Sequence, residues 1–478
     1  MRFKESVEQE MYLKQATKEG NCELVYASLD ILGRQGWKIN RNIFDVVIQV
    51  WNSGDRMGKI PPATFDLPEP VLNNPDSKDL EERGVYLQKL RQYNHLKANN
   101  HSERCSVNYK IEIARTFLGD TFYLPHNVDF RGRAYPIPPH LNHIGDDLSR
   151  ALLLFADGKP LGERGLYWLK IHLANLYGYD KARFDERVQW VEEHLEQIFE
   201  SAENPLEGSR WWLKADDPWQ CLATCIELRN ALQSPEPTQY ECALPVHQDG
   251  TCNGLQHYAA LGGDDRGAKQ VNLAAADRPS DVYTHVSLAV EKLVEQDAAA
   301  GNEMAKILLG KISRKVVKET VMTTVYGVTY VGARDQIDKQ LKDRGDISAE
   351  LCWDAASYLT VKVLSCIGET FTGAKHIQTW LNTCARLIAK SVSPERLRER
   401  IQTAKAKAEG KGKERSTKVD LKKEQMSSVI WTTPLGLPIV QPYRKTPRKQ
   451  ILTNIQSVYI SDPNSIAEGM SDTDFVIR

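Results

Sequence analysis

One eleven-residue stretch, His-Gln-Asp-Gly-Thr-Cys-Asn-Gly-Leu-Gln-His at 247–257, constrains this chain more than any other. The apolar run at 243–246 is typical of a short buried strand, and an apolar helical pattern starts at Gly254 and ends at a pair of glycines. The pattern predicts Asp249 at the end of a buried strand, beside Gly250, which leaves room for a ligand. Because an unpaired buried carboxylate is strongly disfavoured, we expect a divalent cation there.

Two other interpretations of this stretch stay open. Asp249 could cap the helix that follows, since aspartate is a favoured N-cap residue. His247, Cys252 and His257 could bind zinc, although they lack the paired ligand spacing of finger-like sites.

A second stretch, further along the chain, favours the divalent cation. Arg314, Lys318, Met322 and Tyr326 recur at every fourth residue, and Gly327 follows. On a helix these residues form one slowly drifting stripe. Two cations on consecutive turns suit a polyphosphate, and the aromatic residue suits a base or sugar. A solvated face is the alternative, but the valines at other positions predict a helix buried on several sides, where a cation needs an anionic partner.

Together these stretches resemble the single-subunit, phage-type DNA-directed RNA polymerases, most closely the mitochondrial RNA polymerases of animals. Residues 249–257 resemble the first palm motif of that family, and residues 314–327 resemble its fingers-helix motif. Two further matches are Asp129-Phe-Arg-Gly-Arg133 and Trp431-Thr-Thr-Pro-Leu-Gly-Leu-Pro438. The four motifs occur in the family's order, and the resemblance runs from about residue 20 to about residue 460.

The resemblance implies an α+β, helix-rich chain with the right-hand polymerase fold of palm, fingers and thumb. We expect a helical N-terminal part with the start of the palm and the thumb at 1–118, the palm with the first metal motif at 119–272, and the fingers at 273–390. A basic, flexible insertion is expected at 391–426, and 427–478 returns in part to the palm before a divergent tail. A chain of 478 residues is longer than one compact core accommodates, which supports several subdomains. Side-chain periodicity predicts helices at about 23–34, 40–52, 79–98 and 101–118, and a later long helix that Ser280 caps. Core aromatic side chains are expected at Trp168, Trp211, Trp212 and Trp219.

The resemblance also assigns roles to residues of the two main motifs. Asp249 binds metal with help from the Gly250 carbonyl, and the expected cofactor is magnesium, with two ions in the complete enzyme. Nucleotide-binding roles fall on Arg314 and Lys318 for the triphosphate, Lys318 also as proton donor to the leaving pyrophosphate, Tyr326 for the sugar, and Met322 and Gly327 beside it.

Other residues of the site come from the resemblance with a structural alternative for each. Arg150 is expected near the incoming nucleotide, and Tyr283 in its pocket, although core packing accounts equally well for Tyr283. Asp129, Arg131, Gly132 and Arg133 are expected to face nucleic acid; the alternative is an arginine paired to Asp129 or Asp146.

The implied function is DNA-templated RNA synthesis from ribonucleoside triphosphates, with promoter-recognition and melting transcription factors as partners and the mitochondrial matrix as location. The N-terminus resembles neither a secretory signal nor a transit peptide, and no apolar run is long enough for a membrane. Lysine and arginine number 62 against 63 acidic residues, so any nucleic-acid surface must be local. Nine cysteines without paired spacing are typical of a reducing compartment.

One family motif has no counterpart in these residues. The family carries a second metal-binding aspartate in a His-Asp dipeptide, and none of the eleven histidines here is followed by aspartate. We therefore expect a truncated chain with an incomplete palm sheet, whose activity is in doubt. A non-catalytic nucleic-acid-binding or regulatory fragment is one alternative. A family A DNA polymerase, which shares the fingers spacing but lacks Asp-Gly-[Ser/Thr]-Cys, is the other.

Overall fold

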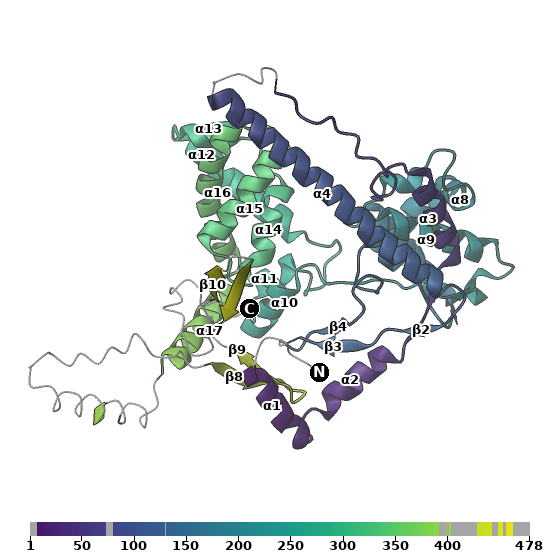
Figure 1. Cartoon of the computed structure of the whole chain (residues 1–478), viewed down its shortest axis with the longest axis horizontal. Coiled ribbons are helices and arrows are strands. Elements are labelled where there is room, and N and C mark those ends of the chain that lie inside the picture. Colours follow the sequence, from purple (N-terminus) through teal and green to yellow (C-terminus); the bar gives the residue numbers. More distant parts are fainter. Residues whose placement is uncertain are drawn as a thin grey trace, which may run out of the picture. The chain divides into compact units, whose positions relative to one another are not determined.

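The computed structural model describes residues 7–72, 80–129, 131–391, 398, 401–402, 428–441, 448–452 and 456–461. Helices dominate these residues, with short antiparallel strands between them (Figure 1). The chain divides into two compact units, residues 1–248 with 433–437, and residues 249–432 with 438–478. The predicted α+β, helix-rich class is confirmed. The subdomain boundaries stay predictions, and most of the basic insertion and of the tail lies outside the described residues.

The first unit holds the N-terminal half of the chain. Its elements are α1 (Val7–Lys18), α2 (Glu23–Gly33), β1 (Gly36–Ile39), α3 (Arg41–Ser53), α4 (Leu80–Thr116), β2 (Phe122–Tyr123), β3 (His126–Val128), β4 (Ala134–Pro136), α5 (Asp147–Ala151), β5 (Leu153–Phe155), β6 (Lys159–Pro160), α6 (Gly162–Tyr177), α7 (Phe184–Glu193), α8 (Leu195–Glu203), η1 (Trp211–Lys214), α9 (Pro218–Gln233), η2 (Pro237–Gln239) and β7 (Glu241–Cys242).

The second unit follows from Asp249. Its elements are α10 (Asn253–Gly262), α11 (Asp265–Gln270), α12 (Val282–Ala299), α13 (Glu303–Leu308), α14 (Arg314–Thr324), α15 (Tyr330–Arg344), α16 (Ala349–Thr370), α17 (Thr372–Lys390), β8 (Val429–Thr432), β9 (Pro438–Gln441), β10 (Arg448–Leu452) and β11 (Ser457–Ser461).

The core of the first unit forms around α9 and a three-stranded antiparallel sheet in the order β2-β1-β5. Trp37 on the central strand pairs with Phe122 on one side and Phe155 on the other. Trp212 and Trp219 are fully buried in this core, as predicted for them, whereas Trp168 is only half-buried.

The long helix α4 differs from the sequence prediction of two helices near 79–98 and 101–118. Asn100, which lies where a break was expected, donates from Nδ2 to the Pro62 carbonyl at 3.3 Å. Arg104 donates to the Pro61 carbonyl at 2.8 Å and lies over the Trp51 ring. These contacts with the proline-rich connector support a residue type that is otherwise a weak helix former, so the helix continues through it.

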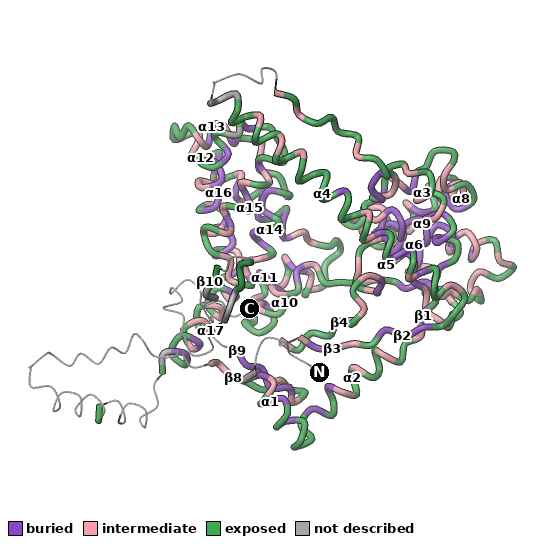
Figure 2. The backbone as a smooth tube through the Cα atoms, viewed as in Figure 1, coloured by how far each residue is buried: buried purple, intermediate pink, exposed green. Residues whose placement is uncertain are grey.

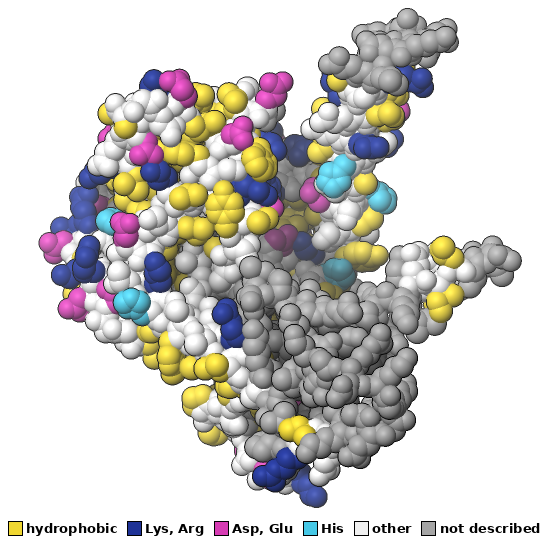
Figure 3. All heavy atoms as spheres, turned by 90° about the vertical axis from the view of Figure 1, so that its left-hand side faces the viewer, with side chains coloured by type: hydrophobic (Ala, Val, Ile, Leu, Met, Phe, Trp, Pro, Cys, Tyr) yellow, Lys and Arg dark blue, Asp and Glu magenta, His cyan; other side chains and the backbone are white. Residues whose placement is uncertain are grey.

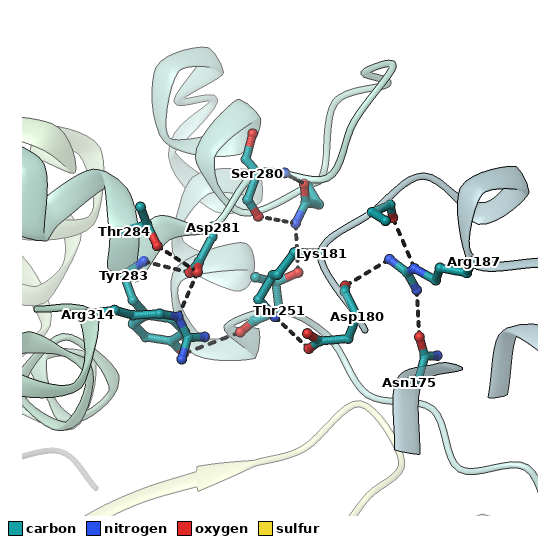
Figure 4. Close-up of polar contacts among 12 residues, drawn as sticks. Asn175, Asp180, Lys181, Arg187, Thr251, Ser280, Asp281, Tyr283, Thr284 and Arg314 are labelled. Atoms are coloured by element: carbon teal, nitrogen blue, oxygen red, sulfur yellow. Dashed lines mark hydrogen bonds and ion pairs between the residues drawn. The ribbon is translucent and has the colours of Figure 1, made fainter. Parts of the chain in front are cut away.

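A buried arginine holds the connection between α6 and α7 (Figure 4). Arg187 donates to the Asn175 side chain at 2.8 Å and to the carbonyls of Asp180 and Ala182 at 2.9 and 3.0 Å. Burial lowers the pKa of Arg187, while the charge of Asp180 opposes that shift. The guanidinium thus satisfies backbone acceptors that would otherwise be orphaned.

The core of the second unit is helical. Val282, Val286, Val290 and Val294 repeat at every fourth residue of α12 and are fully buried against α14 and α16. Figure 2 shows such buried positions recurring along the helices of this bundle. Helix α12 begins one residue later than predicted, because Asp281 rather than Ser280 is its N-cap and accepts from the Tyr283 backbone N–H at 3.1 Å.

On the face shown in Figure 3, acidic, basic and hydrophobic side chains are interspersed, and charges of one sign do not cover it. This agrees with the balanced net charge and leaves nucleic-acid binding to local groups. Within the part of the chain that the structure describes, no helix is both long and apolar enough to span a membrane. All nine cysteines are free thiols.

Candidate functional site

The segment before Asp249 is not the buried strand that the sequence predicts. Residues 243–250 form no strand, and β7 ends at Cys242. Leu244 and Pro245 are buried, but Val246 and Asp249 are exposed. Pro245 explains the difference, since a residue without an N–H cannot complete a strand ladder. Asp249 therefore ends an extended segment at the surface of its unit.

Asp249 is held by its own local contacts. Its Oδ1 accepts from the Gly250 N–H at 2.8 Å and from the Asn253 side chain at 2.6 Å. The capping interpretation is wrong, because Cys252 is the N-cap of α10 and Asp249 bonds no N–H of that helix backbone. The predicted end of the helix is confirmed, since Gly263 closes α10 in a left-handed conformation.

The chemistry of Asp249 fits one magnesium ion. Magnesium binds one or two carboxylates and completes its shell with waters and substrate phosphates. Within the described residues the Oδ2 of Asp249 accepts no hydrogen bond, so one oxygen remains for a metal. The zinc interpretation is not supported, because Cys252 is buried in the core and the described residues contain no cluster of three His, Cys, Asp or Glu side chains suited to a metal.

Helix α14 presents the predicted stripe. Val316, Val317 and Val321 are buried, whereas Lys318, Met322 and Tyr326 are exposed. The helix ends at Thr324, so Tyr326 lies in the closing turn before Gly327, whose φ is +76°. The solvated-face alternative describes Lys318, but Arg314 is partly buried and has the anionic partner that its position requires.

Arg314 is held by two residues at the start of α12 (Figure 4). Its Nε donates to Asp281 Oδ2 at 2.6 Å, and its guanidinium lies 5.0 Å from the centre of the Tyr283 ring. Burial opposes ionisation of Asp281, but hydrogen bonds from Arg314 and Thr284 hold its pKa below the usual range. Since Asp281 takes Nε, the terminal nitrogens of Arg314 can serve a phosphate.

Tyr283 links this arginine to the Asp249 segment. The ring is buried, as the core-packing alternative predicts, and burial raises the pKa of its hydroxyl, which stays protonated. The hydroxyl donates to the Thr251 carbonyl at 3.3 Å. Thr251 lies two residues after Asp249, so the Asp249 segment and the start of α14 are linked by one chain of contacts.

Helices α10 and α14 also meet through a glycine. A Cβ added to Gly254 would lie 2.5 Å from Cγ2 and 2.9 Å from Cβ of Val325. Only glycine permits this approach of the α10 backbone to the end of α14. The stretches at 249–257 and 314–327, distant in sequence, are thus in direct contact within the second unit.

In the first unit, Asp129 organises a tight hairpin between β3 and β4. Its Oδ1 accepts from the N–H groups of Arg131 and Arg133, both at 2.9 Å, and its Oδ2 forms an ion pair with Arg131 at 2.7 Å. Burial raises the pKa of Asp129, but these hydrogen bonds prevail and lower it. The predicted alternative of an arginine paired to Asp129 holds for Arg131, whereas Arg133 is exposed.

The fourth motif packs on this hairpin. Gly132 has a φ of +87°, and a Cβ there would lie 3.5 Å from Leu437 Cδ2. Leu437 belongs to the turn at 433–437, which Gly436 closes with a φ of +87° against the backbone of Asn21. Two motifs that resemble the family therefore meet at one turn of the first unit.

Arg150 lies among histidines of the first unit. Its Nε donates to the Gly145 carbonyl at 2.9 Å. Burial, with the charges of His126 and Arg150, lowers the pKa of His143, and burial with Arg150 and His143 lowers the pKa of His247 to about 4. The imidazoles of His143 and His247 are therefore uncharged at neutral pH. Arg150 is then the cationic side chain of this group that could attract an anion.

The candidate residues thus fall into two sets. The first set, in the first unit, is the Asp129 hairpin with Arg150. The second set, in the second unit, is the Asp249 segment with Tyr283 and the residues of α14. Sequence reasoning missed Asp281 and Asn272, which hold the second set. Aspartate directly before an apolar helical pattern was the available signal for Asp281, because it is a frequent N-cap; nothing in the pattern distinguished Asn272.

Known DNA-directed RNA polymerases are similar in sequence to most of this chain. A family model described as DNA-dependent RNA polymerase matches residues 159–473. The mitochondrial DNA-directed RNA polymerase of Neurospora crassa is 48% identical over 95% of this chain and 33% of its own length. Those of Schizosaccharomyces pombe and Arabidopsis thaliana (DNA-directed RNA polymerase 1) are each 44% identical, over 98% and 96% of this chain and 39% and 44% of their own lengths. The chain therefore spans less than half of each of these relatives, and it belongs to the DNA-dependent RNA polymerase family.

Proposed function

We propose that this chain supplies the nucleotide-binding and first metal-binding part of an RNA polymerase that copies DNA from ribonucleoside triphosphates. The supporting observation is the contact chain of the second unit, in which Arg314 reaches the Asp249 segment through Tyr283 and Thr251. Arg314 is ion-paired through one nitrogen only. The Asp249 carboxylate, in the segment that this contact chain reaches, has one oxygen to which no described residue donates a hydrogen bond. A cation and a carboxylate linked in this way suit a metal–triphosphate.

Each residue then has a separate role. Asp249, with the Gly250 carbonyl, would hold a magnesium ion, which would offset the negative charge of the phosphates and favour ionisation of the attacking hydroxyl. Arg314 and Lys318 bind the triphosphate, and Lys318 donates a proton to the leaving pyrophosphate. Tyr326, on the turn after α14, hydrogen-bonds the ribose 2′-hydroxyl beside Met322.

In the first unit, the nucleic-acid contacts are proposed for the hairpin of Asp129. Arg131 forms an ion pair with Asp129 and shapes the turn. Arg133 is exposed on the same hairpin, and its guanidinium is the candidate for a phosphate of the template–product hybrid. Arg150 is assigned to the incoming nucleotide. The right-hand palm, fingers and thumb arrangement, promoter-specific transcription factors and a mitochondrial matrix location are part of this proposal, because the compared relatives are mitochondrial polymerases.

The test is binding of ATP with Mg²⁺ to purified residues 1–478, measured by calorimetry. Lys318→Ala should weaken binding about tenfold or more, the loss of one charge-assisted contact. Lys339→Ala on the neighbouring helix α15, which removes an equally exposed lysine, should leave the affinity unchanged. Equal affinity of all three proteins would refute the assignment of α14.

Primer extension on the same proteins separates catalysis from binding. Extension that Asp249→Ala abolishes would show that residues 1–478 suffice for catalysis and contain a second metal carboxylate. Binding without extension would identify a nucleotide-binding part that does not catalyse alone, which is the outcome expected from the missing His-Asp dipeptide.

A further inference from the structure

Asn272 lies where the Asp249 segment and the start of α12 come together. Its Nδ2 donates to Thr251 Oγ1 at 2.8 Å and to the Ser280 carbonyl at 2.9 Å. Its Oδ1 accepts from the Ser280 N–H at 2.6 Å. One side chain therefore fixes two backbone segments that are far apart in sequence.

These hydrogen bonds complete a closed ring of contacts, called the circuit below, through Asn272, Thr251, Tyr283, Arg314, Asp281 and Ser280. From Asn272, one arm passes through Thr251 to the Tyr283 hydroxyl, and the Tyr283 ring supports Arg314. The other arm passes through Ser280 to its neighbour Asp281, which holds Arg314 Nε. Figure 4 shows Thr251, Ser280, Asp281, Tyr283 and Arg314 drawn together around this circuit.

The backbone of Asn272 is held in an uncommon conformation, with a φ of +61°. Asparagine adopts this left-handed region more readily than most residues, so the position suits it. The preceding carbonyl, of Val271, accepts from the Gln256 side chain at 2.8 Å. Helix α10 thus also fixes the place of Asn272.

We propose that Asn272 is a positioning residue that couples the metal-binding segment at 249–251 to the triphosphate-binding Arg314. This inference rests on the function proposed above and deepens it. Asn272 touches neither metal nor nucleotide; it sets the distance between the two groups that do. If its side chain is lost, Thr251 and Ser280 move independently, and the metal and Arg314 no longer meet one triphosphate in register.

The experiment measures ATP affinity of purified residues 1–478 by calorimetry, once with Mg²⁺ and once with EDTA. Asn272→Gly keeps the left-handed backbone and removes the amide, while Asn272→Asp keeps the acceptor and removes the donors. Asn272→Asp loses two hydrogen bonds and Asn272→Gly loses three. Both should weaken Mg²⁺–ATP binding about five- to tenfold, because part of the lost hydrogen-bond energy appears in binding. Both should also reduce the gain in affinity that Mg²⁺ confers, because the metal segment is no longer aligned.

Two further proteins make the result decisive. Asn302→Gly removes an asparagine that caps α13 of the same unit through the Ala305 N–H, so it should lower the melting temperature and leave ATP affinity unchanged. In the Arg314→Ala background, Asn272→Gly should weaken ATP binding much less than it does in the wild type, because both residues belong to one circuit.

The outcomes separate this inference from the function on which it rests. If Arg314→Ala weakens ATP binding but both Asn272 variants bind like the wild type, the coupling role is refuted and the proposed function stands. The coupling role is also refuted if Asn272→Gly weakens binding with and without Mg²⁺ equally. If the wild type binds no ATP, or binds it independently of Arg314, the proposed function and the coupling role both fail.

Discussion

The contact between Gly254 and Val325 offers a quantitative test of how the two motifs are joined. Gly254→Ala places a methyl group 2.5 Å from Val325 Cγ2, 2.9 Å from its Cβ and 3.0 Å from its Cγ1, closer than carbon atoms approach in proteins. Because Val325 is 9% exposed and packed in the core, it cannot move aside freely. One of the two helices must shift.

The size of the effect follows from two opposing contributions. Overpacking a well-packed core costs about 1–3 kcal/mol. Alanine in place of glycine within a helix returns about 1 kcal/mol. We therefore expect Gly254→Ala to lower the free energy of unfolding of the second unit by about 0–2 kcal/mol. Val325→Ala alone, which deletes two buried methyl groups, should cost about 2 kcal/mol.

The double variant distinguishes a direct contact from two separate defects. With Val325 shortened, the methyl group added at position 254 fills space that the valine leaves, so the two costs should not add. We expect the double variant to be about 2 kcal/mol more stable than the sum of the single effects predicts, which is a coupling of the size seen for residues in contact. Hydrogen exchange of peptides spanning α10 and α14 measures this locally. Additivity within about 0.5 kcal/mol would refute the packing that joins the two motifs.

Three further predictions follow from single residues. In an active enzyme that contains these residues, Tyr326→Phe should weaken discrimination against deoxynucleotides by about 1–2 kcal/mol, one hydrogen bond, and competition between the two substrates measures it. In the same enzyme, Lys318→Ala should slow nucleotide addition while DNA affinity stays within a few-fold; a collapse of DNA affinity would instead make the lysine a backbone contact. Burial, with the charge of His247, lowers the pKa of His172 from 6.5 to about 4, so the unfolded chain takes up its proton first and stability falls as the pH drops from about 6.5 to 4, by about 3 kcal/mol in all. Urea unfolding at several pH values should show this loss in the wild type and much less of it in His172→Gln.

Local patterns in the sequence anticipated much of the fold. The stripe of α14, the glycine that ends α10 and the helices at 23–34 and 40–52 were predicted from side-chain period and caps, which act within a few residues. The failures differ in cause. At 243–246 a local feature, Pro245, prevents the strand that the apolar run indicates. For α4 the cause is contact with distant residues. Pro61 and Pro62 support α4 through Asn100 and Arg104, where the sequence alone indicated a break.

In the candidate site, too, local patterns were predicted from the sequence and contacts between distant residues were not. Asp249, Arg314 and Lys318 were predicted because their spacing resembles known motifs, and these roles stay predictions. The contacts that link Arg314 to the Asp249 segment were not predicted. Asn272 bonds a residue 21 positions before it and another 8 positions after it, and no periodicity connects the three. Such a role is visible only when tertiary structure brings these segments together.

The two ties to the Asp249 segment act at opposite ends of α14. At its start, Arg314 is joined to Thr251 through Tyr283, and after its last turn Val325 packs on Gly254. An eleven-residue helix is about 16 Å long, so the ties lie well apart. A helix held at one point could pivot and carry Lys318 and Tyr326 away from Asp249, whereas a helix held at both ends cannot. Loss of either tie should therefore leave nucleotide binding weakened but present, and loss of both should remove the alignment of α14 with Asp249.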